Sequence, residues 1–283
     1  MIVDAHVHVF PPDWVAAKEH LLARDSYFET LYRGPRGHMA SADDLLRSMD
    51  EAGVRLSVAA GFGWEDGGLC REQNDYLLEC VRRHPERIVG LATVNPARVR
   101  EAEGEAVRAI EAGLSGIGEL MPDGPGYSLD DRKVMEPLAR VAESLQVPVL
   151  VHVSEPVGHS YPGKGTVAPA QVVATAQAFP SLTLVCAHWG GGLPFYELMP
   201  EVARALARVY YDTAAWPLLY RDEVFASMAG VAPHKVLFAT DYPLISQRQA
   251  LQRLDGVRWD GAVREAVLGG NALRVYRGRK GHC

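Results

Sequence analysis

Short apolar runs rich in β-branched residues alternate with longer amphipathic stretches along this 283-residue chain. Eight such runs recur about every 25 to 35 residues, the spacing of repeated strand–helix units. They occupy residues 1–9, 54–62, 87–95, 114–121, 147–155, 182–190, 209–216 and 235–243. Because most are apolar on both faces, they predict parallel strands covered by helices. Eight such units predict an α/β fold, a (β/α)8 TIM barrel that forms a single domain over residues 1–283.

The stretches between these runs have the periodicity of helices. Residues 41–53, 74–85, 100–113 and 130–145 are amphipathic, and Ser41 is the predicted N-cap of the first of them. An open doubly wound sheet is the alternative, but no GxGxxG motif follows the first strand. The segment over residues 10–40 is rich in aromatic residues, proline and glycine, which predicts a loop over the mouth of the barrel.

Composition limits the classes of partner. The net charge is -6 and no run of Lys or Arg is present, which argues against nucleic acid and against a membrane surface. The four cysteines form no CxxC pair, and Cys186, in an apolar run, is predicted to be a reduced core residue. The chain starts directly with a strand and has no membrane-spanning apolar run. We therefore expect a cytoplasmic protein with a small-molecule substrate; homo-oligomerisation is left open.

The first strand carries two histidines, His6 and His8, at alternating positions. Residues i and i+2 of a strand project to one face, roughly 6.6 Å apart along its axis. Asp4 is therefore expected on the face of the two histidines, and Val3 and Val7 on the other. Because a buried imidazole without a partner costs free energy, the pair predicts that a metal ion is bound on this face.

Four further ionisable residues lie where a predicted strand ends. They are Glu119, His152, His188 and Asp241. The C-terminal ends of barrel strands face the active site, so these residues are expected to join His6 and His8 at one mouth. Taken singly, each has an ordinary explanation, such as a carbonyl partner for a histidine, a turn cap for the aspartate or an arginine partner for the glutamate. Their shared position predicts a metal centre.

The segments VDAHVHVF, CAHWGGGLP, FATDYP and LGGNALRVY resemble those of the amidohydrolase superfamily, in the branch often called amidohydrolase family 2. The resemblance covers almost the whole chain. This branch contains hydrolases and non-oxidative decarboxylases of aromatic or unsaturated acids, including the aminocarboxymuconate-semialdehyde decarboxylase-like proteins. The resemblance implies that His6, His8, His152 and Asp241 bind the metal. It implies that His188 is either a second-site ligand or a catalytic acid–base.

Glu119 departs from the superfamily members that carry a carboxylated lysine at the end of strand four. No lysine stands at that position here, and the nearest one downstream is Lys133. Glu119 resembles instead the strand-four glutamate of the TatD-type metal-dependent nucleases. A carboxylate at this place predicts a bridge between two ions and therefore hydrolysis, although the negative net charge argues against a nuclease. We predict a metal-dependent hydrolase of an ester, lactone, amide or related bond, with a metal-dependent decarboxylase (a lyase) as the alternative.

Imidazole and carboxylate ligands without thiolates suit Zn²⁺, Mn²⁺ or Fe²⁺. We predict one or two ions per chain, with Zn²⁺ as the first choice. A bound ion lowers the pKa of water from about 15.7 to about 7, and Asp241 is the expected general base for that water. His188 is expected to polarise the scissile bond, and Asp4 to orient an imidazole from behind.

Aromatic residues follow several strand ends, and they predict a pocket for a cyclic or unsaturated substrate. Trp189, Trp216 and Tyr242 are the candidate substrate-binding residues, while packing against the barrel rim is the rival interpretation. The segment with His159, Tyr161 and Lys164 is expected to be a solvated loop, with closure over the site as the alternative. The histidines away from strand ends have no predicted role: His20, His38, His84, His234 and His282. A metal-free lactonase and a non-catalytic barrel are the further alternatives.

Overall fold

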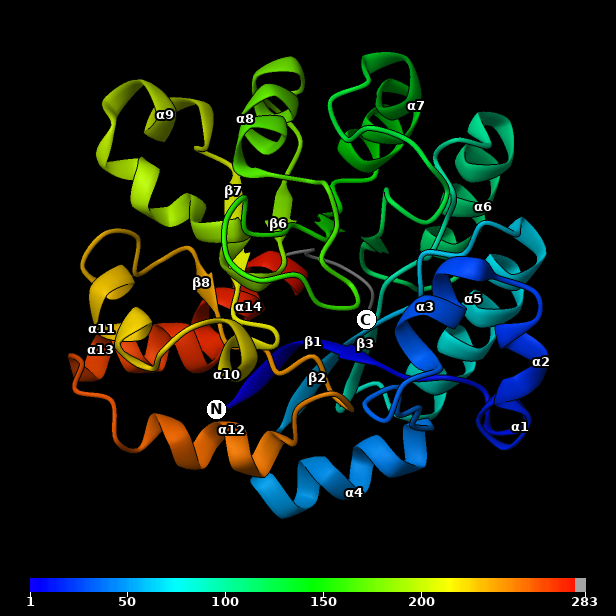
Figure 1. Ribbon diagram of the computed structural model, residues 1–283, viewed down its shortest axis with the longest axis horizontal. Coiled ribbons are helices and arrows are strands. Elements are labelled where there is room, and N and C mark those ends of the chain that lie inside the picture. The colour runs from blue at the N-terminus through cyan, green and yellow to red at the C-terminus, as the bar shows by residue number, and fades with distance from the viewer. Residues whose placement is uncertain (278–283) are drawn as a thin grey trace.

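Parallel strands follow one another around the centre of the molecule in chain order (Figure 1). The computed structural model describes residues 1–277, so residues 278–283 of the predicted domain, including His282, lie outside the described residues. The strands are β1 (Val3–His8), β2 (Leu56–Ala60), β3 (Ile88–Gly90), β4 (Ile117–Leu120), β5 (Val149–Val151), β6 (Leu184–Cys186), β7 (Val209–Asp212) and β8 (Val236–Leu237). Their ladders form two runs, β1 to β3 and β4 to β8.

Backbone hydrogen bonds join these two runs into a ring. Between β3 and β4, the amide of Ala92 donates to the carbonyl of Gly116 (2.8 Å), and the amide of Gly118 donates to the carbonyl of Ala92 (2.9 Å). Between β8 and β1, the amide of Asp241 donates to the carbonyl of His6 at 3.0 Å. The ring of parallel strands confirms the (β/α)8 barrel that the sequence predicts.

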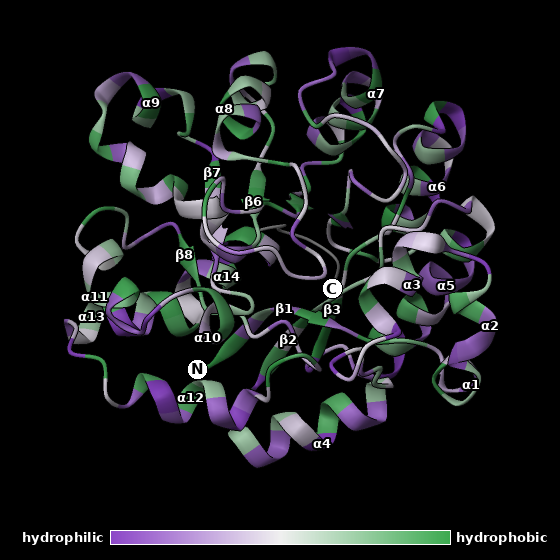
Figure 2. Cartoon of the chain, in the orientation of Figure 1, coloured by the Kyte–Doolittle hydropathy of each residue, from purple (hydrophilic) through white to green (hydrophobic). Residues whose placement is uncertain are grey.

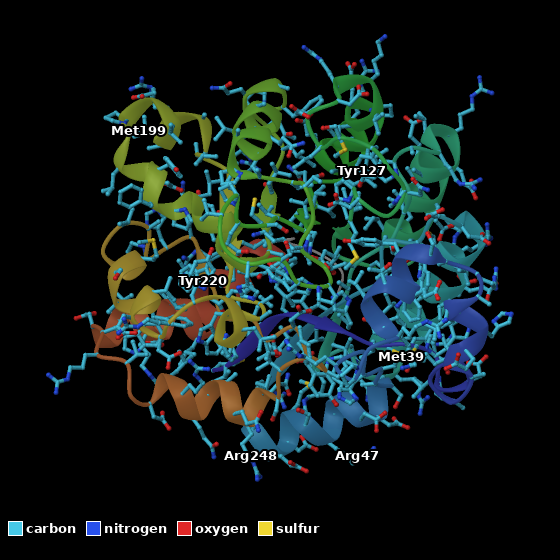
Figure 3. All side chains as sticks on the ribbon, in the orientation of Figure 1. Met39, Arg47, Tyr127, Met199, Tyr220 and Arg248 are labelled. Carbon is cyan, nitrogen blue, oxygen red and sulfur yellow. The ribbon has the colours of Figure 1, made fainter. Side chains whose placement is uncertain are left out.

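Helices surround the strands and present their polar faces outward (Figures 1 and 2). They are α1 (Pro12–Ala16), α2 (Lys18–Leu22), α3 (Ser26–Tyr32), α4 (Ala42–Ala52), α5 (Gly67–Arg83), α6 (Val99–Glu111), α7 (Arg132–Ser144), α8 (Pro169–Ala178), η1 (His188–Leu198), α9 (Pro200–Ala205), α10 (Trp216–Leu219), α11 (Glu223–Ala229), α12 (Gln247–Leu254), α13 (Gly261–Glu265), η2 (Ala266–Gly270) and α14 (Asn271–Tyr276). Arg47 on α4 and Arg248 on α12 project away from the ring (Figure 3). None of the helices in residues 1–277 has the length and apolar character needed to cross a membrane.

The helix predictions hold in outline. Ser41 caps α4 as predicted: its hydroxyl accepts from the amide of Asp44 (3.3 Å), and the Asp44 carboxylate accepts from the amide of Ser41 (2.9 Å). The segment over residues 10–40 is different from the predicted loop, because it contains three short helices, α1 to α3. Buried aromatic residues such as Phe28 pack it against Phe62 and Trp64 at the end of β2.

Two apolar layers form the core. One lies inside the ring and joins residues of several strands, such as Val58 of β2 and Leu150 of β5, with Tyr276 of α14. The larger one lies between the strands and the surrounding helices. Cys186 is part of this larger layer as a buried free thiol, and burial raises its pKa, as expected for an inert core cysteine.

A register shift in β1 interrupts the alternation of its side chains. The pairing of β1 with β2 shifts between Asp4 and Val7. Val3 and Ala5 accordingly pack in the inner layer, whereas Val7 and Val9 pack in the outer one. Such an irregularity changes the face to which the following residues point.

Asp4 therefore does not share the environment of His6 and His8. Its carboxylate accepts hydrogen bonds from the hydroxyl of Thr240 (2.6 Å) and from Nε2 of Gln247 (2.8 Å). The prediction that Asp4 orients an imidazole is wrong, because the register shift turns it toward the start of α12.

A buried ion pair fastens η1 to the start of β8. Nζ of Lys235 donates to both carboxylate oxygens of Glu197 at 2.8 Å and to the carbonyl of Leu206 at 2.9 Å. The hydroxyl of Tyr211 donates to the same carboxylate at 2.6 Å. The two charged side chains are only 9% exposed, so each depends on the other for compensation of its charge.

Replacement of Lys235 by methionine is expected to lower the free energy of unfolding by about 3–5 kcal/mol, because it leaves a buried carboxylate without its counter-charge. Urea unfolding measures the loss. The Lys235→Met/Glu197→Gln double variant removes that isolated charge and should recover part of the stability. A single variant as stable as the wild type would contradict this account of the pair.

Candidate metal centre

The six residues predicted as metal ligands meet at the C-terminal ends of the strands. They are His6 and His8 in β1, Glu119 in β4, His152 after β5, His188 after β6 and Asp241 after β8. Oε2 of Glu119 lies 3.4 Å from Nε2 of His6 and also 3.4 Å from Nε2 of His8. The structure thus brings together residues that are far apart in the sequence.

The other contacts extend this cluster around the mouth. Oε1 of Glu119 lies 3.1 Å from Nδ1 of His152, and that nitrogen lies 3.2 Å from Nε2 of His188. Nε2 of His8 lies 3.3 Å from Oδ1 of Asp241. Glu119 is therefore in the middle of the cluster, in contact with histidines from three strand ends.

The close approach of β4 to β5 depends on Gly118. Its φ of 132° is a conformation that side-chain-bearing residues rarely adopt, and a Cβ atom here would lie 2.4 Å from the carbonyl oxygen of Leu150. Glycine therefore allows the end of β4 to place the Glu119 carboxylate beside His152.

Hydrogen bonds on the far side of three histidine rings fix which nitrogen faces the cluster. Nδ1 of His6 lies 2.9 Å from Oδ2 of Asp212, and Nδ1 of His188 lies 2.9 Å from the carbonyl of Ala214. Nε2 of His152 lies 2.9 Å from the carbonyl of Gly163. Since a carbonyl or carboxylate oxygen only accepts, each of these nitrogens carries the proton. The opposite nitrogen then presents a lone pair to the centre of the cluster.

The spacing of these atoms fits one shared cation. Nε2 of His6 and Nε2 of His8 are 3.1 Å apart, and both are 3.4 Å from the Glu119 carboxylate. Two atoms bound to one ion at about 2.1 Å lie about 3.0 to 3.4 Å apart for bond angles between a right angle and the tetrahedral value. Imidazole nitrogens and carboxylate oxygens are also the donor set that Zn²⁺, Mn²⁺ and Fe²⁺ accept. The residues present therefore fit a divalent ion.

The pKa shifts of two carboxyl groups in the cluster also favour a bound cation. Burial opposes ionisation of Glu119, but the neighbouring imidazoles, His6 first and then His152, outweigh it and hold the pKa of the Glu119 carboxyl well below its ordinary value. For Asp241, burial is likewise outweighed, by a hydrogen bond from His8 and by nearby imidazoles, and the pKa falls to about 2. Two ionised carboxylates in a buried site require positive charge beside them.

Asp212 is a site residue that the sequence interpretation missed. It ends β7, and its carboxylate holds Nδ1 of His6 while accepting hydrogen bonds from the amides of His188 (3.2 Å) and Ala214 (2.9 Å). The strand-end rule also selects this residue, because Asp212 follows an apolar run as Asp241 does. This carboxylate has the orienting role that had been expected of Asp4.

Asp212→Asn is expected to weaken metal binding about 10- to 100-fold, because the partners of ligating histidines set ring orientation and basicity. Competition with a chelator of known affinity measures the change. Asp255→Asn, at an exposed position, is the matched control. Unchanged affinity in Asp212→Asn would show that the His6 ring is held without this carboxylate.

A cavity of about 320 Å³ opens directly above the cluster. Its floor contains His8, Glu119, His152, His188 and Asp241, whereas His6 lies beneath them and is fully buried. The walls come from residues 30–38 after and within α3, residues 159–163 between β5 and α8, and apolar side chains near α10 and β8, such as Leu218 and Leu244. This volume is at the lower end of the range, about 300–1,000 Å³, of small-molecule pockets.

The aromatic residues proposed for substrate binding lie elsewhere. Trp189 and Trp216 are buried in an apolar cluster around Phe225, and Tyr242 packs against the outer core layer. None of these three is among the described residues that line the cavity. The prediction of direct substrate contact is corrected in favour of the rival interpretation: these side chains pack against apolar clusters outside the cavity.

Residues given little weight by the sequence interpretation line the cavity instead. Tyr32, Arg36 and His38 reach it from the segment after β1, and His159 and Tyr161 reach it from the segment between β5 and α8. The latter segment therefore contributes to the cavity wall, while residues 156–160 at its tip are exposed to solvent, as predicted. No strand-end rule identifies these residues, since their positions depend on how two connecting segments fold over the barrel.

Comparison with known proteins supports the family and corrects the reaction. A family model described as amidohydrolase matches residues 3–278. The 2-amino-3-carboxymuconate-6-semialdehyde decarboxylase of Dictyostelium discoideum is 22% identical, over 96% of this chain and 90% of that protein. The structure of 5-carboxyvanillate decarboxylase from Sphingomonas paucimobilis superposes with a TM-score of 0.80 at 19% identity, over 98% of both chains.

A further structure shows the same fold. The 5-carboxyvanillate decarboxylase of Novosphingobium aromaticivorans, complexed with manganese and 4-hydroxy-3-methoxy-5-nitrobenzoic acid, has a TM-score of 0.76 at 15% identity, over 98% of this chain and 96% of that one. The hydrolase prediction is overturned by these findings, because the Dictyostelium relative, matched over 96% of this chain, is named a decarboxylase. Glu119 misled the interpretation: a carboxylate in contact with the histidines balances the charge of the site whatever the reaction, and does not by itself indicate hydrolysis.

Proposed function

This chain belongs to the amidohydrolase family, in its family 2 branch, and we propose that it is a metal-dependent, non-oxidative decarboxylase of a small aromatic or unsaturated carboxylic acid. The observation that carries the proposal is the small cavity whose floor is the histidine–carboxylate cluster and whose wall contains an arginine. The decarboxylase activity named for the Dictyostelium relative supports the reaction.

The metal would be held among the six predicted ligands: His6, His8 and Glu119 form one close group, Glu119, His152 and His188 form another, and Asp241 lies beside His8. A bound divalent ion would polarise an oxygen of the substrate and stabilise negative charge that develops on it. Zn²⁺ stays the prediction from the donor set, and manganese in the Novosphingobium structure makes Mn²⁺ the second ion to test. The number of ions, one or two, stays a prediction as well.

Arg36 is the proposed anchor for an acidic group of the substrate. It is the single lysine or arginine among the described residues that line the cavity. Its guanidinium has no ion-pair partner within residues 1–277. A guanidinium binds a carboxylate through two parallel hydrogen bonds, so an unpaired one beside a pocket favours an anionic ligand.

Asp241 and His188 are the proposed carriers of the proton. Decarboxylation breaks the bond between the carboxyl carbon and the adjacent carbon, whose electron pair then takes a proton as CO₂ leaves. Asp241, at 14% side-chain exposure, faces the cavity and would receive a proton from solvent or from a substrate hydroxyl and deliver it to that carbon. His188, with Nδ1 held by Ala214, directs Nε2 toward the cluster and would orient that hydroxyl.

The remaining predictions extend this proposal. They are a single domain over residues 1–283, a cytoplasmic location and a possible homo-oligomer, and they stay predictions.

A substrate screen in D₂O tests the proposal. Hydroxylated benzoates and unsaturated dicarboxylates are incubated with metal-loaded protein while CO₂ is detected and the product is followed by NMR. We expect CO₂ from at least one acid and deuterium at the carbon that carried the carboxylate. Release of alcohol or amine from an ester, lactone and amide panel, with no CO₂ from any acid, would contradict it.

A further inference from the structure

The connection between β5 and α8 forms a closed loop over the cavity. At its base, the amide of Ser154 donates to the carbonyl of Val167 (2.8 Å), and the amide of Gly165 donates to the hydroxyl of Ser154 (2.9 Å). These contacts bring the ends of residues 155–166 together, as in a compact Ω-loop. Asp123, between β4 and α7, accepts from the amide and hydroxyl of Thr166 at 2.9 Å and 2.7 Å and fixes the loop to its neighbour.

The side chain of Lys164 binds backbone carbonyls within this loop. Its ammonium donates to the carbonyls of Val157 (2.7 Å), His159 (3.2 Å) and Gly158 (3.3 Å). An ammonium has three N–H donors, and here all three are used on the backbone of one loop. Lys164 therefore ties the tip of the loop to its returning arm.

The residue before Lys164 is in contact with the candidate metal centre. The carbonyl of Gly163 accepts from Nε2 of His152, which leaves Nδ1 of His152 facing Glu119. The partners of His6 and His188 belong to β7 or follow it directly, so the strand end holds those rings. His152 differs, because the nearer of the two groups beside its Nε2 is on the loop: the carbonyl of Gly163 lies at 2.9 Å, whereas the hydroxyl of Ser154 lies at 3.4 Å.

We propose that Lys164 is a positioning residue for the metal centre: by gathering three loop carbonyls it keeps the carbonyl of Gly163 against His152, so that this ring offers Nδ1 to the ion. The inference rests on the metal site of the proposed function. It also explains why His152 faces the cluster through Nδ1 whereas His6, His8 and His188 do so through Nε2. The same loop supplies Tyr161 and Gly163 to the cavity wall, so its shape affects both the metal and the substrate.

The test compares the rate of zinc release from wild type, Lys164→Met and Lys133→Met. Each zinc-loaded protein is mixed with an excess of a chromogenic chelator, and the absorbance of the complex is followed. Methionine keeps the apolar stem and removes the donors, and Lys133 is an exposed lysine on α7 that serves as the matched control. We expect release to be about 10- to 100-fold faster in Lys164→Met, the usual cost of losing an outer partner of a ligand, and unchanged in Lys133→Met.

Two further measurements separate positioning from general stability. Lys164→Arg keeps the charge and several donors, and should restore slow release in large part. Long-range ¹H–¹⁵N spectra of the zinc-loaded wild type should show His152 bound through Nδ1 with a proton on Nε2, and this signal should be mixed or lost in Lys164→Met. If Lys164→Met does not fold, Thr166→Val, which removes the hydroxyl contact with Asp123, takes its place with the same expected direction.

The outcomes are distinct. Wild-type release rates in Lys164→Met, or equally fast release in Lys164→Arg and Lys164→Met, would overturn the positioning role while leaving the metal site intact. A wild-type protein that retains no zinc or manganese would overturn the metal site, and the inference with it.

Discussion

Removal of the divalent ion is expected to lower the rate of decarboxylation by at least about 10³-fold, because a metal ion contributes several kcal/mol of charge stabilisation and each 1.4 kcal/mol is a factor of ten in rate. The protein itself supplies no substitute at that place: Glu119 and Asp241 are ionised carboxylates, which would repel a substrate carboxylate. Dialysis against a chelator, followed by the CO₂ assay, measures the loss.

Readdition of Zn²⁺ or Mn²⁺ should restore activity, whereas Mg²⁺, which binds imidazole poorly, should not. The ion should also raise the melting temperature, since a ligand that binds only the folded state stabilises it. Full activity in protein shown by elemental analysis to be free of metal would refute the role of the cluster.

Asp241→Asn is expected to lower kcat by about 10²- to 10⁴-fold, the usual contribution of a positioned proton donor. The amide keeps the size of the side chain but cannot carry the proton that replaces CO₂. Because Asp241 is also a proposed ligand, 3.3 Å from Nε2 of His8, kcat is measured at saturating metal and together with metal content. KM should change far less than kcat if the interaction is made mainly in the transition state.

Asp43→Asn, at an exposed position on α4, is the control and should leave kcat and KM unchanged. The solvent isotope effect adds a sharper criterion, since a variant in which proton delivery limits the rate should show a larger ratio of kcat in H₂O to kcat in D₂O than the wild type. An Asp241→Asn protein with full metal content and wild-type kcat would show that His188 or solvent delivers the proton.

Strand order and strand-end chemistry could be predicted from the sequence. The alternation of apolar runs identified the barrel, and the rule that strand C-termini face the site selected His152, His188, Glu119 and Asp241, which the structure brings together with the HxH pair. The prediction of the barrel and the prediction of the strand-end residues both rest on the strand–helix unit that repeats along the chain and on the shared direction of its parallel strands. Asp212 was open to the same rule and was overlooked.

Other features could not be predicted, because they depend on contacts between distant segments. The register shift in β1 turns Asp4 toward Thr240 and Gln247, so strict alternation fails within one strand. Trp189 and Trp216 follow strand ends as catalytic residues do, yet packing around Phe225 directs their rings away from the cavity.

By itself, the sequence determined the barrel, the family and the set of residues gathered at its mouth, because strand periodicity and chain order decide which side chains the ends of eight parallel strands present. Tertiary structure alone decided which nitrogen of each imidazole faces the centre, and which side chains enclose the cavity. Arg36 reaches it from the helical segment after β1, and Gly163 meets His152 from the loop after β5. These contacts are made by connecting segments whose conformations depend on packing between residues remote in the chain, and no local periodicity encodes that packing.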